Sequence, residues 1–181
     1  METNRSIIRK HAGYLGHYYI GQARALSKIL GFSYWPCDAA PSDYESLLKE
    51  YNKSMQTRQA LPVYSGGNQN IIYPEIEHNL AFRFLHDVMH CHYKFDFSYN
   101  GELNASNKML ENMILPHFGE SIEALIYIAD TIGQVQFYKL YSGFVENQDS
   151  FVCRLVSHAL DQNMNSQEFK QWILARENFN P

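Results

Sequence analysis

Only three cysteines occur in the 181 residues of this chain, Cys37, Cys91 and Cys153. The number is odd and no pair has the spacing of a metal site, so neither a disulfide framework nor a cysteine-rich zinc site is expected. A reducing compartment, the cytoplasm, is expected instead. No apolar run approaches the roughly 18 residues of a membrane span. The N-terminus also lacks the apolar core of a signal peptide.

Charge is sparse as well, because Asp, Glu, Lys and Arg make up 19% of the residues and the net charge is -4. This balance gives no basic footprint for nucleic acid. The glycines near residues 61–74 lack the spacing of a motif that cradles phosphate. We therefore expect a small-molecule substrate and neither a nucleic-acid nor a membrane partner. The sequence leaves a homo-oligomer open.

Hydrophobic residues, at 45%, are plentiful enough for a folded core. They recur at helical spacing, and Gly-Gly-Asn interrupts two short β-prone runs in residues 61–74. The sequence therefore predicts a mainly α fold: one helical domain over 1–181, a bundle of six or seven helices with a small hairpin or ordered loop near 61–74. The expected helices cover residues 5–30, 42–58, 75–92, 101–114, 120–142, 150–161 and 167–177.

Histidine is concentrated between positions 78 and 92, where four of the eight histidines lie. His86 and His90 belong to the pattern His-Asp-x-x-His, and Glu102 follows twelve residues later. On a helix, residues four apart lie one turn apart on the same face. That is the spacing by which one helix offers two imidazoles to one metal ion.

The same helix carries a polar stripe. Asn79, Arg83, His86 and His90 follow one another at intervals of four, three and four residues, while apolar residues cover most of the remaining surface. A helix that is apolar on most sides is expected to be buried. Its polar stripe then needs hydrogen bonds, charges or a metal, because unpaired buried polar groups cost free energy. This stripe predicts a metal or catalytic site.

Two carboxylates could complete such a site. Asp130 lies in an apolar run, with Gln134 one turn further on, and a buried carboxylate needs a partner or a cation. Its alternative partners are Arg83 or a core tyrosine. Glu102 follows Gly101 at the start of a predicted helix, where an acid also simply favours the helix dipole.

At His86 and Asp87 the chain resembles the HD-domain metal-dependent phosphohydrolases, over about residues 78–135. Members of that helical superfamily hold a divalent metal with an adjacent His-Asp pair and a later Asp. The resemblance implies that His86, Asp87 and Asp130 are metal ligands. The continuation from His90 to Glu102 is similar to the branch that hydrolyses deoxynucleoside triphosphates, which would place both residues beside the scissile phosphate. Met89 stands where that branch has Gly, and the spacing from His90 to Glu102 is longer.

Two alternatives stay open. His-Asp-x-x-His with Glu102 mimics the His-Glu-x-x-His zinc peptidases and their distal Glu ligand, with Asp87 in place of the catalytic Glu. The other is a non-enzymatic helical interaction protein with a structural or vestigial metal site.

The resulting hypothesis is a metal-dependent hydrolase, foremost a phosphohydrolase acting on a nucleotide or another small phosphate ester through a metal-activated water. Glu102 would be a further ligand or the general base, and Arg83 would stabilise developing negative charge. Asn79 and Gln134 would orient the substrate or the ligands. Such mixed donors suit Zn, Mn or Fe more than Mg. The predicted metal ligands are His86, Asp87, His90 and Asp130.

Overall fold

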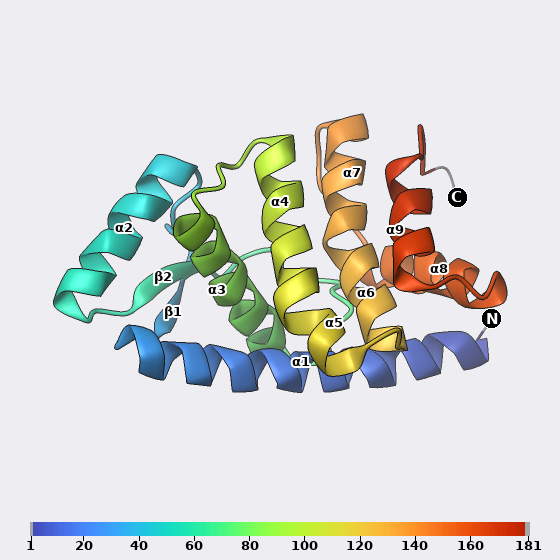
Figure 1. Ribbon diagram of the computed structural model, residues 1–181, viewed down its shortest axis with the longest axis horizontal. Coiled ribbons are helices and arrows are strands. Elements are labelled where there is room, and N and C mark those ends of the chain that lie inside the picture. The colour runs from blue at the N-terminus through green and yellow to red at the C-terminus, as the bar shows by residue number, and fades with distance from the viewer. Residues whose placement is uncertain (1, 180–181) are drawn as a thin grey trace. The chain divides into compact units, whose positions relative to one another are not determined.

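The structure is a computed structural model that describes residues 2–179, and most of them are helical (Figure 1). This confirms the predicted mainly α fold. The elements, in chain order, are α1 (Glu2–Leu30), β1 (Tyr34–Cys37), α2 (Tyr44–Thr57), β2 (Leu61–Tyr64), α3 (Ile76–Tyr93), α4 (Tyr99–Met109), the π-helical turn η1 (Leu110–Ile114), α5 (Leu115–Phe118), α6 (Ile122–Asp130), α7 (Ile132–Tyr141), α8 (Gln148–Asp161) and α9 (Ser166–Leu174).

Some of these helices are continuous with one another. α4, η1 and α5 follow without a break, and only Thr131 separates α6 from α7. Counted as continuous segments, the described residues contain seven helical stretches, within the six or seven expected.

Two departures from the predicted bounds change the course of a helix. The segment expected to stop before Pro116 continues to Phe118, because the wide π-helical turn just before it relieves the clash and the missing hydrogen bond that proline causes in an α-helix. The helix expected over 120–142 is interrupted at Thr131. Its hydroxyl donates to the carbonyl oxygen of Tyr127 at 2.7 Å, and such back-bonding bends helices.

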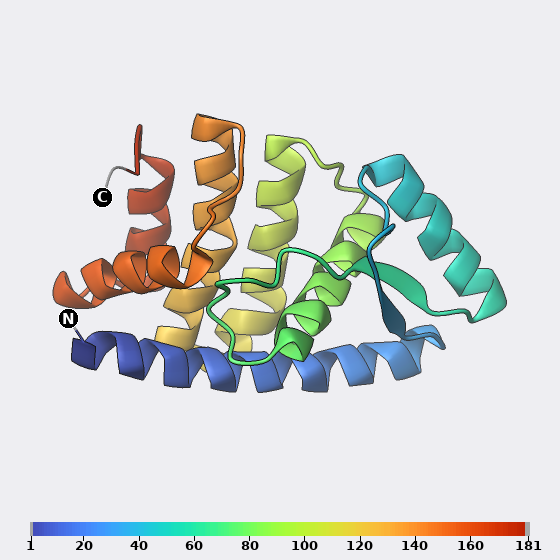
Figure 2. The same ribbon diagram turned by 180° about the vertical axis from the view of Figure 1, so that it is seen from behind.

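A two-stranded sheet replaces the predicted hairpin. β1 and β2 pair in parallel, with Tyr34 opposite Leu61 and Cys37 opposite Tyr64 (Figure 2). Parallel strands need a crossover, which α2 supplies. Leu61 and Val63 are fully buried, so alternate residues of β2 face the core. Residues 65–75 contain no helix or strand. For this part of the segment 61–74, the structure therefore agrees with the loop that the sequence offered as the alternative to a hairpin.

The structure divides into two compact units, and the single domain expected over 1–181 stays a prediction. Unit 2 comprises residues 15–68 and 75–105, and unit 1 comprises 1–14, 69–74 and 106–181. In unit 2, α3 is the central buried helix: nine of its eighteen residues are buried. The other elements of this unit contribute buried apolar side chains, including Leu15, Tyr19, Leu47, Leu61 and Val63.

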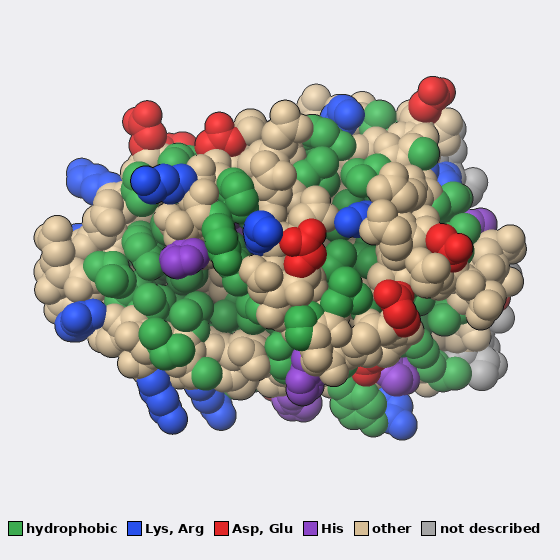
Figure 3. Space-filling view, in the orientation of Figure 1, with side chains coloured by type: hydrophobic (Ala, Val, Ile, Leu, Met, Phe, Trp, Pro, Cys, Tyr) green, Lys and Arg blue, Asp and Glu red, His purple; other side chains and the backbone are tan. Residues whose placement is uncertain are grey.

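Unit 1 is organised on α6, whose residues from Glu123 to Asp130 are all buried. α7, α8 and α9 pack against it. The Tyr127 hydroxyl donates to the carbonyl oxygen of Ser106 at 2.8 Å inside this core. Among residues 2–179 no helix combines the length and the hydropathy needed to cross a bilayer. Charged side chains of both signs are interspersed on the face that Figure 3 shows.

Replacing Asp149 with Asn is expected to destabilise the protein by about 1.5–3 kcal/mol, the range for hydrogen bonds to charged groups. Arg9 donates to both carboxylate oxygens of Asp149 at 2.8 Å, and Arg5 donates to one of them. The Asp149 side chain is only 10% exposed. Urea unfolding at pH 7 measures the difference, and Asp161→Asn, at an exposed position that ends the same helix, is the matched control.

The effect of Asp149 also depends on pH. Hydrogen bonding from Arg9 and Arg5 lowers the pKa of Asp149 below its ordinary 3.8, against the opposing effect of burial. A carboxyl with a lowered folded pKa contributes stability that is complete above the ordinary value and is lost as the pH falls through the folded value. The difference between wild type and Asp149→Asn should therefore shrink below pH 3.8. A difference that is unchanged in acid would contradict this assignment.

Candidate metal centre

The candidate site is built on α3 of unit 2. The helix ends at Lys94, whose left-handed backbone (φ 58°) reverses the chain, and its N–H donates to the carbonyl oxygen of His90. After the short segment 95–98 the chain enters α4, and the first turn of α4 contains Glu102. A helical turn and a chain reversal thus bring His86, His90 and Glu102 together, as the sequence predicted for the histidine pair.

Three donor atoms converge in this cluster. The Nε2 atoms of His86 and His90 are 3.0 Å apart. Oε2 of Glu102 lies 3.1 Å from the first and 3.4 Å from the second. Ligand atoms bound at about 2.0–2.1 Å in a tetrahedron are about 3.3–3.4 Å apart. Among the described residues this is the group of His, Cys, Asp and Glu side chains whose donor atoms all lie within 4.8 Å of one another.

The hydrogen bonding of the two imidazoles supports a cation at this point. Nδ1 of His90 lies 2.9 Å from the carbonyl oxygen of Phe95, which can only accept, so this nitrogen carries a proton. In the neutral His90 ring, Nε2 then carries a lone pair that points toward the other two donor atoms. Nδ1 of His86 is buried without a hydrogen-bond partner among the described residues. The lone pair of His90, the Nε2 atom of His86 and the carboxylate can therefore share either a proton or a metal ion.

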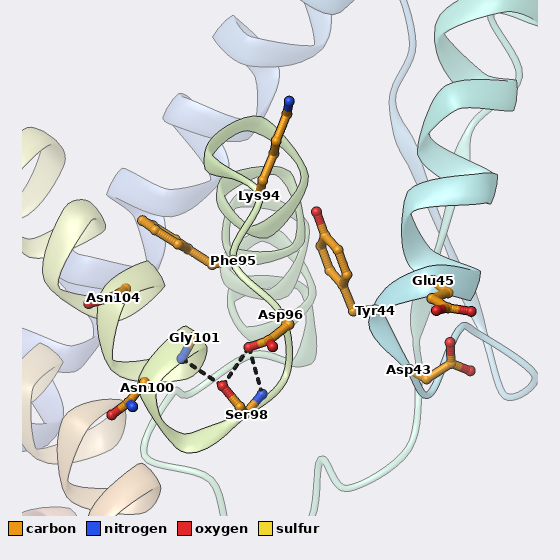
Figure 4. A pocket seen from close by; sticks show the side chains of 10 residues that line it. All are labelled: Asp43, Tyr44, Glu45, Lys94, Phe95, Asp96, Ser98, Asn100, Gly101 and Asn104. Carbon is orange, nitrogen blue, oxygen red and sulfur yellow. Dashed lines mark hydrogen bonds between the residues drawn. The ribbon is translucent and has the colours of Figure 1, made fainter.

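The segment between the helices fixes Glu102. Asp96 accepts hydrogen bonds from the N–H and hydroxyl of Ser98, and the N–H of Gly101 donates to the Ser98 hydroxyl oxygen at 3.2 Å (Figure 4). The N–H of Glu102 donates to the carbonyl oxygen of Ser98 at 2.9 Å. This turn starts α4 and places Glu102 within hydrogen-bond distance of His86. The Phe97 ring also lies edge-on to the His90 ring, with centroids 4.9 Å apart.

An open recess of about 880 Å³ borders this turn. It is lined by Tyr44, Lys94, Phe95 and Gly101 among others, whereas the three donor residues of the cluster do not line it (Figure 4). Asp96 and Ser98 also face it, but their polar atoms bond within the turn. The recess therefore marks an approach to the turn and adds no ligand to the cluster.

The pKa values of the cluster describe its metal-free state. Burial would raise the pKa of Glu102, but hydrogen bonds with His86 and His90 outweigh it and lower that pKa to about 2. Burial would likewise lower the pKa of His90, yet its hydrogen bond with Glu102 and the charge of that carboxylate raise it. For His86 burial prevails and lowers the pKa. Glu102 is therefore ionised, and its charge favours the protonated form of His90 when no metal is bound.

Asp87 lies beside this cluster but is not part of it. Its carboxyl interacts electrostatically with His90, Glu102 and Arg83, and burial raises its pKa to about 7. It is absent from the group of converging donors found among the described residues. The predicted ligand role of Asp87 thus lacks support.

Asp130 has other partners. It is buried on α6 in unit 1, where the Tyr73 hydroxyl donates to it at 2.8 Å and the Gln134 amide at 3.0 Å. A core tyrosine is one of the partners expected as an alternative to a metal. The donor group found among the described residues does not include Asp130. Gln134 accordingly orients Asp130 rather than the histidine cluster.

The remaining predicted residues serve the loop after β2. Arg83 donates to the carbonyl oxygens of Tyr64 and Gly66, the latter at 2.7 Å. Asn79 donates to the side-chain oxygen of Asn68 at 2.7 Å. The polar stripe therefore has two parts. Asn79 and Arg83 bind the loop after β2, and His86 and His90 form the cluster with Glu102. Arg83 is engaged with backbone, which does not support its predicted role on developing negative charge.

The carbonyl oxygen of Phe95 and the Phe97 ring were not anticipated as parts of the site. The aromatic run of residues 93–97 is visible in the sequence. A backbone acceptor, however, leaves no signature in the residue types. Comparison with family models, with curated proteins and with solved structures gave no match for this chain.

Proposed function

We propose that the protein is a metal-dependent hydrolase whose ion is held by His86, His90 and Glu102. The observation that carries the proposal is the convergence of their three donor atoms at 3.0–3.4 Å. Two imidazoles and one carboxylate leave coordination positions for water and substrate, as in catalytic rather than closed structural sites. This donor set suits Zn, Mn or Fe more than Mg.

The surrounding residues would prepare the site. When bound, such an ion lowers the pKa of water and supplies a hydroxide nucleophile near neutral pH. Phe95 fixes the tautomer of His90 through its carbonyl oxygen, as second-shell acceptors do for metal-binding histidines. Asp87, with a pKa of about 7, would take up the proton from the attacking water and return it to the leaving group.

The donor set favours an acyl bond over a phosphate ester as the target. Glu102, not Asp130, accompanies the histidine pair, which is the pattern of the two-His-one-carboxylate peptidases. Arg83 binds backbone carbonyls, so the described cluster has no guanidinium directed at a phosphate. The phosphohydrolase interpretation, with a nucleotide or another small phosphate ester as substrate, is the second candidate. It rests on the resemblance of His86 and Asp87 to the HD domain.

A substrate panel with and without metal tests the proposal. Zn-, Mn- and Fe-loaded protein would be assayed on aryl esters, peptides, aryl phosphates and nucleotides, before and after treatment with a chelator. We expect acyl cleavage that the chelator abolishes and added metal restores. Phosphate release instead would favour the second candidate. A bound metal with no turnover of any substrate would leave a non-enzymatic interaction protein and refute the hydrolase.

Replacing Asp130 with Asn separates the two ligand sets. We expect unchanged metal affinity, because Asp130 bonds to Tyr73 and Gln134. The HD-domain ligand set predicts loss of the metal in the same variant. Isothermal titration of metal-free protein with Zn²⁺ measures the affinity, and thermal unfolding of the variant checks that the core of unit 1 is intact.

We also propose that the protein works in the cytoplasm. Cys37, Cys91 and Cys153 are free thiols, which suits a reducing compartment. Fractionation of cells that express the full chain tests this proposal, and recovery in an oxidising compartment would refute it.

A further inference from the structure

A second histidine of α3 has no satisfied polar atom. His78 lies in the first turn of the helix and its side chain is 0% exposed. Neither Nδ1 nor Nε2 has a hydrogen-bond partner among the described residues. Buried polar atoms in folded proteins nearly always have a partner, and an unsatisfied one costs free energy. The position of this ring therefore calls for a ligand.

A glycine on α1 leaves the space that this ring occupies. A Cβ atom at Gly16 would lie 2.4–2.8 Å from three atoms of His78, closer than real Cβ contacts. Gly16 thus lets the imidazole lie directly against the α1 backbone within unit 2. Burial lowers the pKa of His78 and favours the neutral ring, which is the form that binds metals.

Two further donors flank the ring. Oε2 of Glu75, the residue that precedes α3, lies 3.8 Å from Nε2 of His78, too far for a hydrogen bond but close to the spacing of two ligands on one ion. The imidazole of His17 stands edge-on to that of His78, with ring centroids 4.8 Å apart and an interplanar angle of 81°. Glu75 and His17 are both exposed, so their side chains can turn toward the buried nitrogen on a fast timescale.

We propose that His17, Glu75 and His78 bind a second divalent transition-metal ion, which clasps α1 to the start of α3. Two imidazoles and a carboxylate suit Zn²⁺ and other first-row transition-metal ions more than Mg²⁺, as at the first site. The site shares no residue with His86, His90 and Glu102. His78 and His86 are eight residues apart on one helix, about 12 Å along its axis. Because it joins two helices of unit 2, the second ion stabilises that unit and takes no part in the proposed hydrolysis.

Counting bound ions tests this proposal. Metal-free protein is titrated with Zn²⁺, and Cu²⁺ electron paramagnetic resonance reports how many imidazole nitrogens surround each ion. We expect two ions per wild-type chain. His17→Ala and Glu75→Gln change exposed side chains, so both variants should fold. Each should weaken the second ion by about 10–100-fold or more, since even a partner outside the ligand shell is worth that much.

The controls keep the two sites apart. His86→Ala should lose the other ion and retain the one at His78, while His92→Ala, an exposed imidazole on the same helix, should keep both. One ion per wild-type chain that is lost in His86→Ala would overturn the second site and leave the hydrolase proposal intact, whereas one ion that persists in His86→Ala would support the second site and refute the first. Two ions that persist unchanged in both His17→Ala and Glu75→Gln would overturn it as well.

Discussion

Replacing His86 with Ala is expected to lower the Zn²⁺ affinity of the proposed metal site by more than the 10–100-fold that loss of a second-shell partner costs. The substitution removes a nitrogen that lies 3.0 Å from Nε2 of His90 and 3.1 Å from Oε2 of Glu102. With two donors left, the ion has no protein-imposed geometry, and the proposed hydrolysis should fall to background. Competition with a chromophoric chelator measures the affinity.

Glu102→Gln is the companion variant. The substitution keeps the shape of the side chain and removes its charge. That charge raises the pKa of His90 in opposition to the effect of burial, and it could also balance the charge of a bound cation. We expect a loss of Zn²⁺ affinity comparable with that of His86→Ala. The chain supplies a matched control in His92→Ala, because His92 is exposed and lies two residues beyond His90 on the same helix. If His92→Ala weakened the metal as much as His86→Ala, the assignment of the ligands would be wrong.

Gly101→Ala is expected to destabilise unit 2 by about 1–3 kcal/mol or more, the usual cost of overpacking. A Cβ atom at this position would lie 1.9 Å from the carbonyl oxygen of Asp96 and 2.5 Å from its carboxylate. The closest obstacle is backbone, which cannot move aside as the end of a flexible side chain can. The segment 95–98 would have to shift, and it carries both the acceptor of His90 and the turn that leads into Glu102. Metal affinity should therefore fall together with stability.

Gly21→Ala is the control for this prediction. Gly21 lies inside α1, and apart from its chain neighbours and the backbone of its own helix, no atom of the described residues lies within 4 Å of the place where its Cβ would be. Alanine in a helix interior is favoured over glycine by about 0.5–1 kcal/mol, so this variant should be neutral or more stable. Urea unfolding and Zn²⁺ titration of both variants measure the two effects. A Gly101→Ala protein with wild-type stability and full metal affinity would contradict the close approach at Asp96.

The histidine pair could be predicted because its geometry is local. A helix places residues i and i+4 on one face whatever surrounds it, and the apolar residues around His86 and His90 made that helix evident. The choice of carboxylate was not local. Glu102 joins the pair because Lys94 adopts a left-handed conformation and the Asp96–Ser98–Gly101 hydrogen bonds begin a new helix. Asp130 had an equally plausible setting in the sequence, but Tyr73, 57 residues away along the chain, donates a hydrogen bond to it.

The sequence by itself determined the mainly α fold, the polar stripe of α3 and the spacing of its histidines, since each follows from helical periodicity and burial. Tertiary structure alone decided how that stripe was used. Arg83 and Asn79 bind the loop after β2. The strand β2 in turn pairs with β1, which requires the crossover through α2. Tertiary structure also left His78 buried beside Gly16 and His17. Contacts between distant segments depend on packing, which residue spacing does not encode. These contacts made one part of the stripe an anchor for the loop after β2 and the other part a candidate metal centre.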